Sequence, residues 1–129
     1  MSDLLKELGY PDTSSLTKTK IAKLTKSKND TVLVAEVDGK VIGLAHLHVA
    51  ELFHEPGKLG RIMALVVNKK YRKVGVGHKL MVSLETIARK AGCTKMEVTS
   101  SVHRSEAHKF YQKLGYFEKP KRFIKMLDI

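Results

Sequence analysis

The sequence has a single cysteine and only three prolines among its 129 residues. Because Cys93 has no second cysteine to pair with, no disulfide can form within the chain, and such a lone thiol is more often a small buried residue than a nucleophile. Apolar runs are short, as at 41–45, whereas a membrane-spanning helix needs about 20 apolar residues. These absences exclude an internal disulfide framework, and we expect no membrane partner.

The start of the chain also lacks the features of a secretory signal peptide. The first ten residues carry acids where a signal peptide has bases, and they have no apolar centre. We therefore expect a cytoplasmic protein. No repeat, low-complexity tract or linker divides the chain, and 129 residues is the size of one domain, so we expect residues 1–129 to form a single domain.

Acidic residues are few relative to basic ones. The chain has 24 Lys and Arg against 13 Asp and Glu, a formal charge of +11 at pH 7. Such an excess attracts polyanions, which include nucleic acid, anionic lipid and phosphorylated cofactors. The bases are scattered and have no regular aromatic residues between them, so a nucleic-acid function rests on charge alone and is not favoured.

The pattern of apolar residues predicts strands first and then alternating helices and strands. Residues 31–37 and 41–49 are β-rich runs joined by Asp38 and Gly39, a strong hairpin signal. From Gly77 to Ala91 apolar residues recur at helical spacing, and Gly92 ends the helix. We also expect strands at 61–67, 95–100 and 123–127, a helix at 105–114, and short helices at 3–10 and 17–26. The order predicts an α/β (α+β) domain with a mixed, largely antiparallel sheet flanked by helices.

The most informative segment is a glycine-rich turn at residues 72–78, between an apolar strand and a helix. Gly75 and Gly77 stand at the opening of the helix, where free backbone amides form an anion site and glycine allows a ligand to approach closely. Gly-x-Gly alone also fits a tight turn without a ligand. The segment does not match the dinucleotide pattern, because Leu80 stands at its third glycine position, and it does not match the Walker loop.

The residues around the turn strengthen the case for a ligand. Arg72 stands three residues before Gly75, and this turn resembles the R/Q-x-x-G-x-G/A signature of the GNAT superfamily of N-acetyltransferases. Residues 107–116 resemble the family's A-x-x-F-Y-x-x-x-G-[FY] segment, although alone they also fit an ordinary amphipathic helix capped by Gly115. The two motifs occur in the family's order and separation, and the resemblance covers roughly residues 31–127.

The resemblance implies a GNAT-like fold and direct transfer of an acetyl group from acetyl-CoA to an amine, without a metal. By resemblance, the pyrophosphate would lie on the amides of the turn, and the pantetheine arm would pair with the end of the preceding strand. The phenol of Tyr111 matches the family tyrosine that lies near the sulfur and can protonate the leaving thiolate. The cofactor-binding residues so implied are Leu65, Val66, Val67, Arg72, Lys73, Val74, Gly75, Val76, Gly77 and His78, and Lys79 could add charge.

The sequence also departs from the family pattern. Many relatives carry a glutamate as general base on the strand before the turn, but residues 61–64 contain no carboxylate. Other bases remain open, including a chain of water molecules, and the side-chain candidates are His46, His48, Glu51, His54, Glu55 and Glu97. Arg104 replaces a common asparagine. The family's usual first strand is not evident before Leu4, so we expect the hairpin at the edge of the sheet, where a homodimer could form.

Two further function classes fit parts of the sequence. The absent carboxylate would suit an acyl-CoA-binding module without turnover, and the charge would suit a basic nucleic-acid-binding domain. The acceptor cannot be read, because specificity lies in loops such as 50–60, so a small amine, an amino acid, an antibiotic and a protein lysine all remain open.

Overall fold

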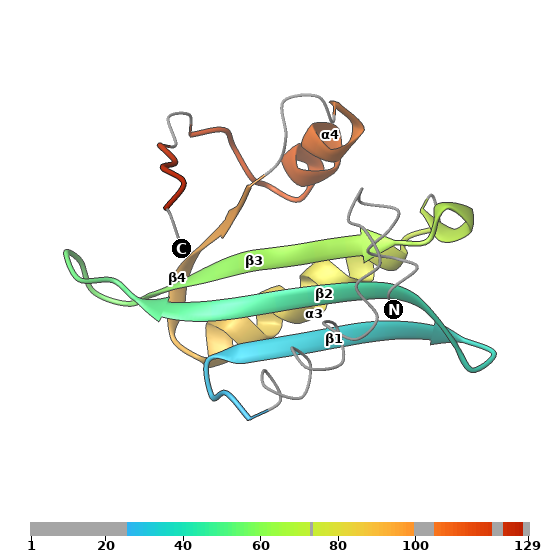
Figure 1. The fold of residues 1–129 in the computed structure, drawn as a ribbon, viewed down its shortest axis with the longest axis horizontal. Coiled ribbons are helices and arrows are strands. Elements are labelled where there is room, and N and C mark those ends of the chain that lie inside the picture. The colour runs from blue at the N-terminus through green and yellow to red at the C-terminus, as the bar shows by residue number, and fades with distance from the viewer. Residues whose placement is uncertain (1–25, 73, 100–104, 120–122, 128–129) are drawn as a thin grey trace. The chain divides into compact units, whose positions relative to one another are not determined.

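The computed structural model describes residues 26–72, 74–99, 105–119 and 123–127. The chain divides into two compact units, Met1–Thr99 and Ser100–Ile129, and each is described by itself. The first unit holds four strands, a short 3-10 helix η1 and helix α3, and the second holds helix α4 (Figure 1). The helices predicted at 3–10 and 17–26 lie outside the described residues, apart from position 26.

The unit Met1–Thr99 begins with the predicted hairpin. Strand β1 spans Asp30–Val37 and strand β2 spans Lys40–Glu51. Asp38 and Gly39 between them have φ angles of 51° and 76°, the left-handed values that a tight hairpin turn requires. The Asp-Gly signal therefore set the position of this turn correctly.

Two more strands complete a sheet with the order β1-β2-β3-β4. Strand β3, Lys58–Val67, is antiparallel to β2, and strand β4, Cys93–Val98, is parallel to β3. Helix α3, Val76–Lys90, makes the crossover between β3 and β4 (Figure 1). The sheet is mixed and largely antiparallel with β1 at one edge, as predicted.

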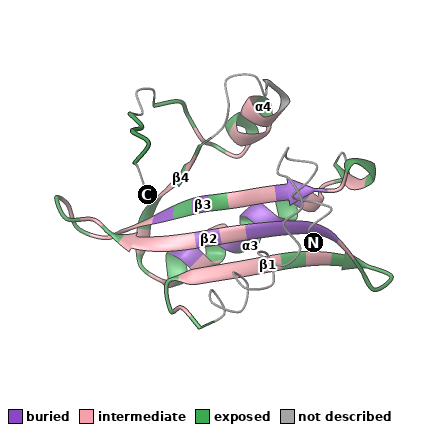
Figure 2. Ribbon diagram, in the orientation of Figure 1, coloured by how far each residue is buried: buried purple, intermediate pink, exposed green. Residues whose placement is uncertain are grey.

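Helix α3 covers one face of this sheet, and the core lies between them. The helix buries Leu80, Met81, Leu84 and Ala88, which lie on one helical face, and the Leu47 side chain of β2 points to the same side as Ala88. Figure 2 shows buried segments on both α3 and β2. Gly43 on β2 and Gly60 on β3 leave room for neighbouring side chains to approach the backbone of the sheet closely. A Cβ on Gly43 would lie 3.2 Å from the side chains of Leu80 and Val76, and one on Gly60 would lie 2.6 Å from the sulfur of Met96.

Strand β3 carries a β-bulge in its ladder with β2. His46 is opposite Ala64 while Leu47 is opposite Ile62, so Met63 is an extra residue in the ladder with β2. The β3–β4 ladder joins Lys58 to Cys93 and ends where Ile62 meets Val98. From Ala64 to Val67, β3 is therefore paired on its β2 side and, within the described part of the chain, has no ladder partner on its β4 side.

The unit Ser100–Ile129 contains α4, Ser105–Lys113, which ends before Gly115 at a φ of 95°. The helix agrees with the prediction for 105–114. The strand predicted at 123–127 is wrong, because these residues form no strand in the structure. Their apolar composition suits a strand, but a strand also needs a partner backbone, and Phe123, Met126 and Leu127 are exposed instead. Among the described residues, no helix is long and apolar enough to cross a membrane.

Candidate functional site

The carboxyl end of β3 leads into a turn held by short hydrogen bonds. The backbone N–H of Asn68 donates to the carbonyl of Ile42 on β2 at 2.7 Å, and its side chain accepts from the N–H of Lys70 at 3.0 Å. This side chain caps η1, Lys69–Tyr71. Nε of Arg72 donates to the carbonyl of Val67 at 2.9 Å, so the predicted phosphate-binding arginine also fastens the turn to the strand.

The turn delivers the chain to the amino end of α3 through Gly75. This residue is the N-cap of the helix and has a φ of 88°, which glycine adopts without steric cost. It provides no side-chain cap, and the first turn contains no acidic residue. The first backbone bond of the helix runs from Lys79 N–H to Gly75 O at 3.0 Å, so the amides of Val76, Gly77 and His78 lack an acceptor within the helix.

Free amides at a helix amino terminus are of the kind to which phosphates bind. They carry the positive end of the helix dipole, and a Cβ placed on Gly75 would meet no atom within 4 Å, so the backbone is open above the turn. Val74 and His78 are exposed beside it, and Lys73 lies outside the described residues. The described part of the turn thus has free amides and an open backbone, and phosphate binding there stays a prediction.

The strand before the cradle offers its backbone and not its side chains. Val66 and Val67 are buried in the core, and Leu65 is half-buried. Their ladder partners on β2 are Leu44, Gly43 and Ala45. The opposite edge of this segment is where an extended chain could add by strand-like pairing.

Tyr111, the predicted proton donor, belongs to α4 in the second unit. Its ring packs edge to face against Phe110 at 5.2 Å and against Tyr116 at 5.9 Å between ring centroids. The side chain is half-buried, and the N–H of Tyr116 donates to the Tyr111 carbonyl at 3.0 Å. Tyr111 is thus fixed within an aromatic group of its own unit.

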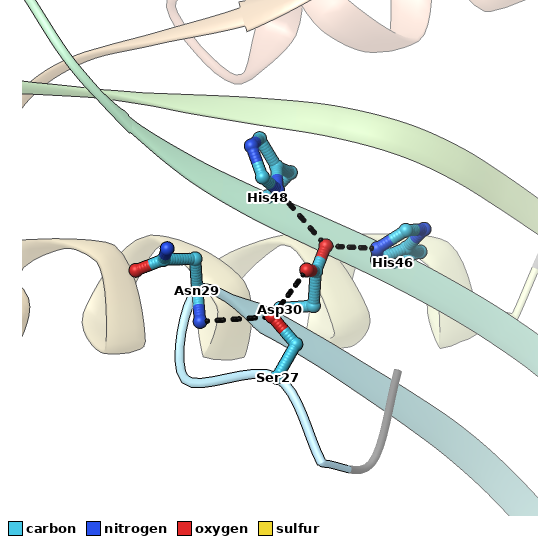
Figure 3. Close-up of polar contacts among 5 residues, drawn as sticks. All are labelled: Ser27, Asn29, Asp30, His46 and His48. Carbon is cyan, nitrogen blue, oxygen red and sulfur yellow. Dashed lines mark hydrogen bonds and ion pairs between the residues drawn. The ribbon is translucent and has the colours of Figure 1, made fainter. Parts of the chain in front are cut away.

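A polar cluster that sequence reasoning missed lies on the sheet face opposite α3. Oδ1 of Asp30 is 2.8 Å from Nε2 of His46 and 3.0 Å from Nδ1 of His48 (Figure 3). The hydroxyl of Ser27 donates to Oδ2 at 2.7 Å. The sequence drew attention to both histidines as candidate bases, but Asp30 was not among the candidates.

The carboxyl group of Asp30 is held in its ionised form. Burial alone would raise its pKa, but hydrogen bonds from His46, Ser27 and His48 outweigh burial and lower the pKa of Asp30 from 3.8 to about 2. Both ring nitrogens that face Oδ1 therefore act as donors. The carboxylate fixes the orientation of the two rings.

The remaining base candidates are paired with cations or lie in the loop. Glu97 of β4 accepts from Arg61 of β3 at 3.1 Å. In the loop around 51–58, Glu55 pairs with Lys95 and lies 3.4 Å from His54, and Glu51 lies 3.8 Å from Lys58. Within the described ranges, no set of three His, Cys, Asp or Glu residues is arranged to hold a metal ion.

The strand order, the bulged strand and the open helix terminus define a class of fold, and comparison with known proteins identifies it. The model of the Acetyltransferase (GNAT) family matches residues 2–116, and the chain belongs to this family. Its fold is the GNAT acyl-CoA N-acyltransferase fold, as predicted.

Two curated relatives show which N-acetyltransferases the chain resembles. It is 34% identical over 90 residues to the aminoalkylphosphonate N-acetyltransferase of Salmonella typhimurium, an alignment that covers 70% of this chain and 58% of the relative. It is 35% identical over 79 residues to the glucosamine 6-phosphate N-acetyltransferase of Trypanosoma brucei brucei, covering 60% and 52% respectively. The matches thus span less than two thirds of each relative.

Solved structures agree on the fold. A GNAT family acetyltransferase of Staphylococcus aureus aligns with a TM-score of 0.81 and 25% identity, over 98% of this chain and 86% of that one. The glucosamine-6-phosphate N-acetyltransferase of Arabidopsis thaliana aligns with a TM-score of 0.83 and 23% identity, over 99% and 89%.

Proposed function

We propose that this chain transfers an acetyl group from acetyl-CoA to a primary amine of a small molecule. The observation that carries the proposal is the open amino terminus of α3 directly after the end of β3 that β4 leaves unpaired. The helix terminus offers an anion site for a pyrophosphate. The adjacent strand edge offers backbone groups for an amide-containing arm joined to that pyrophosphate. The named relatives are N-acetyltransferases, which supports the same reaction.

The residues present fit acetyl-CoA, which supplies the activated acyl group as a thioester when it is bound. The N–H groups of Val76 to His78 would donate hydrogen bonds to the pyrophosphate oxygens, with Val74 and Gly75 leaving room for them. Arg72 and Lys73 would add positive charge. The backbone of Leu65, Val66 and Val67 would pair with the pantetheine amides, and a backbone N–H of this strand would polarise the thioester carbonyl.

We assign protonation of the leaving sulfur to Tyr111. This assignment depends on the match of residues 107–116 to the family segment, in which the tyrosine carries out this step. A phenol remains protonated at neutral pH, since its pKa is about 10, and can therefore act as a donor.

For the acceptor we propose an amine that also carries a phosphonate or phosphate group. The names of both relatives specify such molecules, an aminoalkylphosphonate and glucosamine 6-phosphate. The formal charge of +11 on this chain favours anionic substrates over cationic ones. We further propose that 1–129 acts as one cytoplasmic acetyltransferase domain and that β1, the edge strand, can pair in a homodimer.

The experiment is a screen for amine-dependent release of thiol from acetyl-CoA. Aminoalkylphosphonates and hexosamine phosphates form the first panel, and their hydroxy analogues, which lack the amine, form the control panel. We expect release with at least one amine and with no analogue, and mass spectrometry should show the acetylated amine. Thiol release that does not depend on the amine would contradict the proposed transfer.

A further inference from the structure

The polar cluster lies on the sheet face opposite α3, whereas residues 61–64 of the strand before the turn carry no carboxylate that could act as a base. We propose that His48 is the general base of the transfer, accepting the proton of the attacking amine at Nε2, and that Asp30 is the positioning residue that holds its ring. This inference rests on the proposed function, because it assigns a step of the same reaction. It is carried by the geometry of β1, β2 and the bulge in β3.

The first step of the argument is where the acyl group would lie. If the phosphates occupy the start of α3 and the arm runs back along β3 from Val67, the acyl end lies near Met63, where β3 and β4 part. The span from Met63 to Val67 is four residue steps, about 13 Å of extended strand. The acyl end would therefore lie at the bulge.

The second step is that His48 lies beside this point and on the accessible face. In the register, His48 is opposite Arg61 and His46 is opposite Ala64, so the two histidines flank the bulge from the neighbouring strand, about 4.8 Å away. Leu47 between them points into the core against α3. Side chains alternate along a strand, so both histidines point to the face that α3 does not cover.

The third step is the tautomer. Asp30 is ionised, so Nδ1 of His48 must carry the proton of the 3.0 Å hydrogen bond, and Nε2 of the neutral ring then has its lone pair free to accept a proton. No hydrogen bond to Nε2 of His48 occurs among the described residues. A carboxylate also stabilises the imidazolium that forms, the arrangement found in acid–base dyads.

The fourth step distinguishes the two histidines. The side chain of His48 is 41% exposed, whereas those of His46 and Asp30 are 16% and 10% exposed. His48 can therefore meet a substrate, while His46 serves as a second donor to Asp30. Among the described residues of β3 and β4, the charged groups nearest His48 in the ladder are Arg61, opposite it on β3, and Glu97, which pairs with Arg61 from β4.

The step balances. Nε2 of His48 takes the proton that the amine nitrogen loses as the C–N bond forms. The C–S bond breaks, and the sulfur leaves with the proton of Tyr111. The imidazolium and the phenolate return to their starting forms by exchange with solvent, and no oxidant or metal is required.

The test uses His48→Asn, because the asparagine amide takes roughly the place of Nδ1 and keeps the bond to Asp30 while removing Nε2. We expect kcat/KM to fall about 10²- to 10⁴-fold with CoA affinity unchanged. Asp38→Asn in the exposed hairpin turn is the control and should keep full activity. His46→Gln keeps a donor near the place of Nε2 and should lose less than tenfold.

Rescue and pH dependence separate a catalytic role from a structural one. Added imidazole should restore activity to His48→Ala and not to His46→Ala. The wild type should lose kcat/KM on the acid side of its pH profile, and this acid limb should be absent in His48→Asn. Asp30→Asn should lower kcat at least tenfold, because the amide no longer fixes the tautomer.

The outcomes distinguish this inference from the proposed function. If the wild type is active and His48→Asn keeps its kcat/KM, His48 is not the base, and acetyl transfer stands. If His46→Gln loses as much as His48→Asn and imidazole rescues only His46→Ala, the assignment to His48 is overturned. If the wild type binds CoA but transfers to no amine, both proposals fall.

Discussion

Nδ1 of His48 lies 3.0 Å from Oδ1 of Asp30, and the two residues are opposite each other in the β1–β2 ladder. The pair joins the edge strand to the strand that borders the bulge in β3. The hydrogen bond therefore joins the two strands of the hairpin on the face of the sheet where we place the proposed base.

Replacing Asp30 by asparagine should destabilise the protein in a pH-dependent way. Because the pKa of Asp30 is lowered from 3.8 to about 2, its ionised form contributes about 2 kcal/mol of stability at neutral pH. A lowered pKa makes this contribution complete above about pH 4 and removes it as pH falls toward 2. Urea unfolding of wild type and Asp30→Asn between pH 7 and pH 2.5 should show a difference that shrinks in acid.

The control for this measurement is Asp38→Asn in the exposed hairpin turn, where asparagine tolerates the positive φ. It should change the free energy of unfolding by less than about 0.5 kcal/mol at every pH. A gap between wild type and Asp30→Asn that is constant with pH would show that the carboxylate charge is not what stabilises the cluster.

Packing of α3 on the sheet should depend on its buried face alone. Leu84 is fully buried, whereas Val82 on the same helix is 43% exposed. We expect Leu84→Ala to lower the free energy of unfolding by about 2–5 kcal/mol and Val82→Ala by about 0.5 kcal/mol or less. Equal losses in chemical denaturation would mean that the helix does not pack as described.

Tyr111→Phe tests the proton donor. The variant keeps the ring and its edge-to-face contacts with Phe110 and Tyr116 but removes the hydroxyl. Turnover should fall about 10²- to 10⁴-fold, or at least tenfold if water partly replaces the phenol, with CoA affinity little changed. Tyr116→Phe is the matched control and should keep its turnover. Full activity in Tyr111→Phe would remove this residue from the mechanism.

Local signals in the sequence were sufficient for the hairpin, for α3 and for the glycine turn. Asp38 and Gly39 dictate left-handed backbone, and the spacing of Leu80, Leu84 and Ala88 defines one helical face. Each of these features depends on residues close together in the chain. The GNAT family was recognised from two such local motifs, at 72–77 and 107–116.

The pairing of Asp30 with His48 could not be read in the same way. Counting outward from the turn, where Val37 is opposite Lys40, would place Asp30 opposite Leu47 and thus on the α3 face. A bulge between Ala35 and Glu36 shifts the register by one residue. The shift places Asp30 on the other face, and no local sequence signal predicts it.

The prediction of a strand at 123–127 was wrong for a related reason. Phe123, Ile124 and Leu127 have the composition of a strand, but composition does not specify a partner. The bulge at Met63 in the β2–β3 ladder likewise depends on contacts distant in sequence. The backbone features that shape the candidate site were therefore less predictable than the residue types within it.

The most direct test of the account is whether acetyl-CoA binds at the amino end of α3. Gly75 and Gly92 stand at opposite ends of the helix, with φ angles of 88° and 94°, and a Cβ on either would meet no atom within 4 Å. Valine at either position should strain the backbone by about 1–2 kcal/mol, but only at Gly75 would it block a phosphate.

Calorimetric titration of acetyl-CoA into the wild type, Gly75→Val and Gly92→Val, each checked for folding, gives the answer. We predict that Gly75→Val raises Kd at least tenfold, a loss of about 1.4 kcal/mol, while Gly92→Val binds as the wild type does. Equal affinity in all three proteins would contradict the account, because the phosphates would then lie elsewhere.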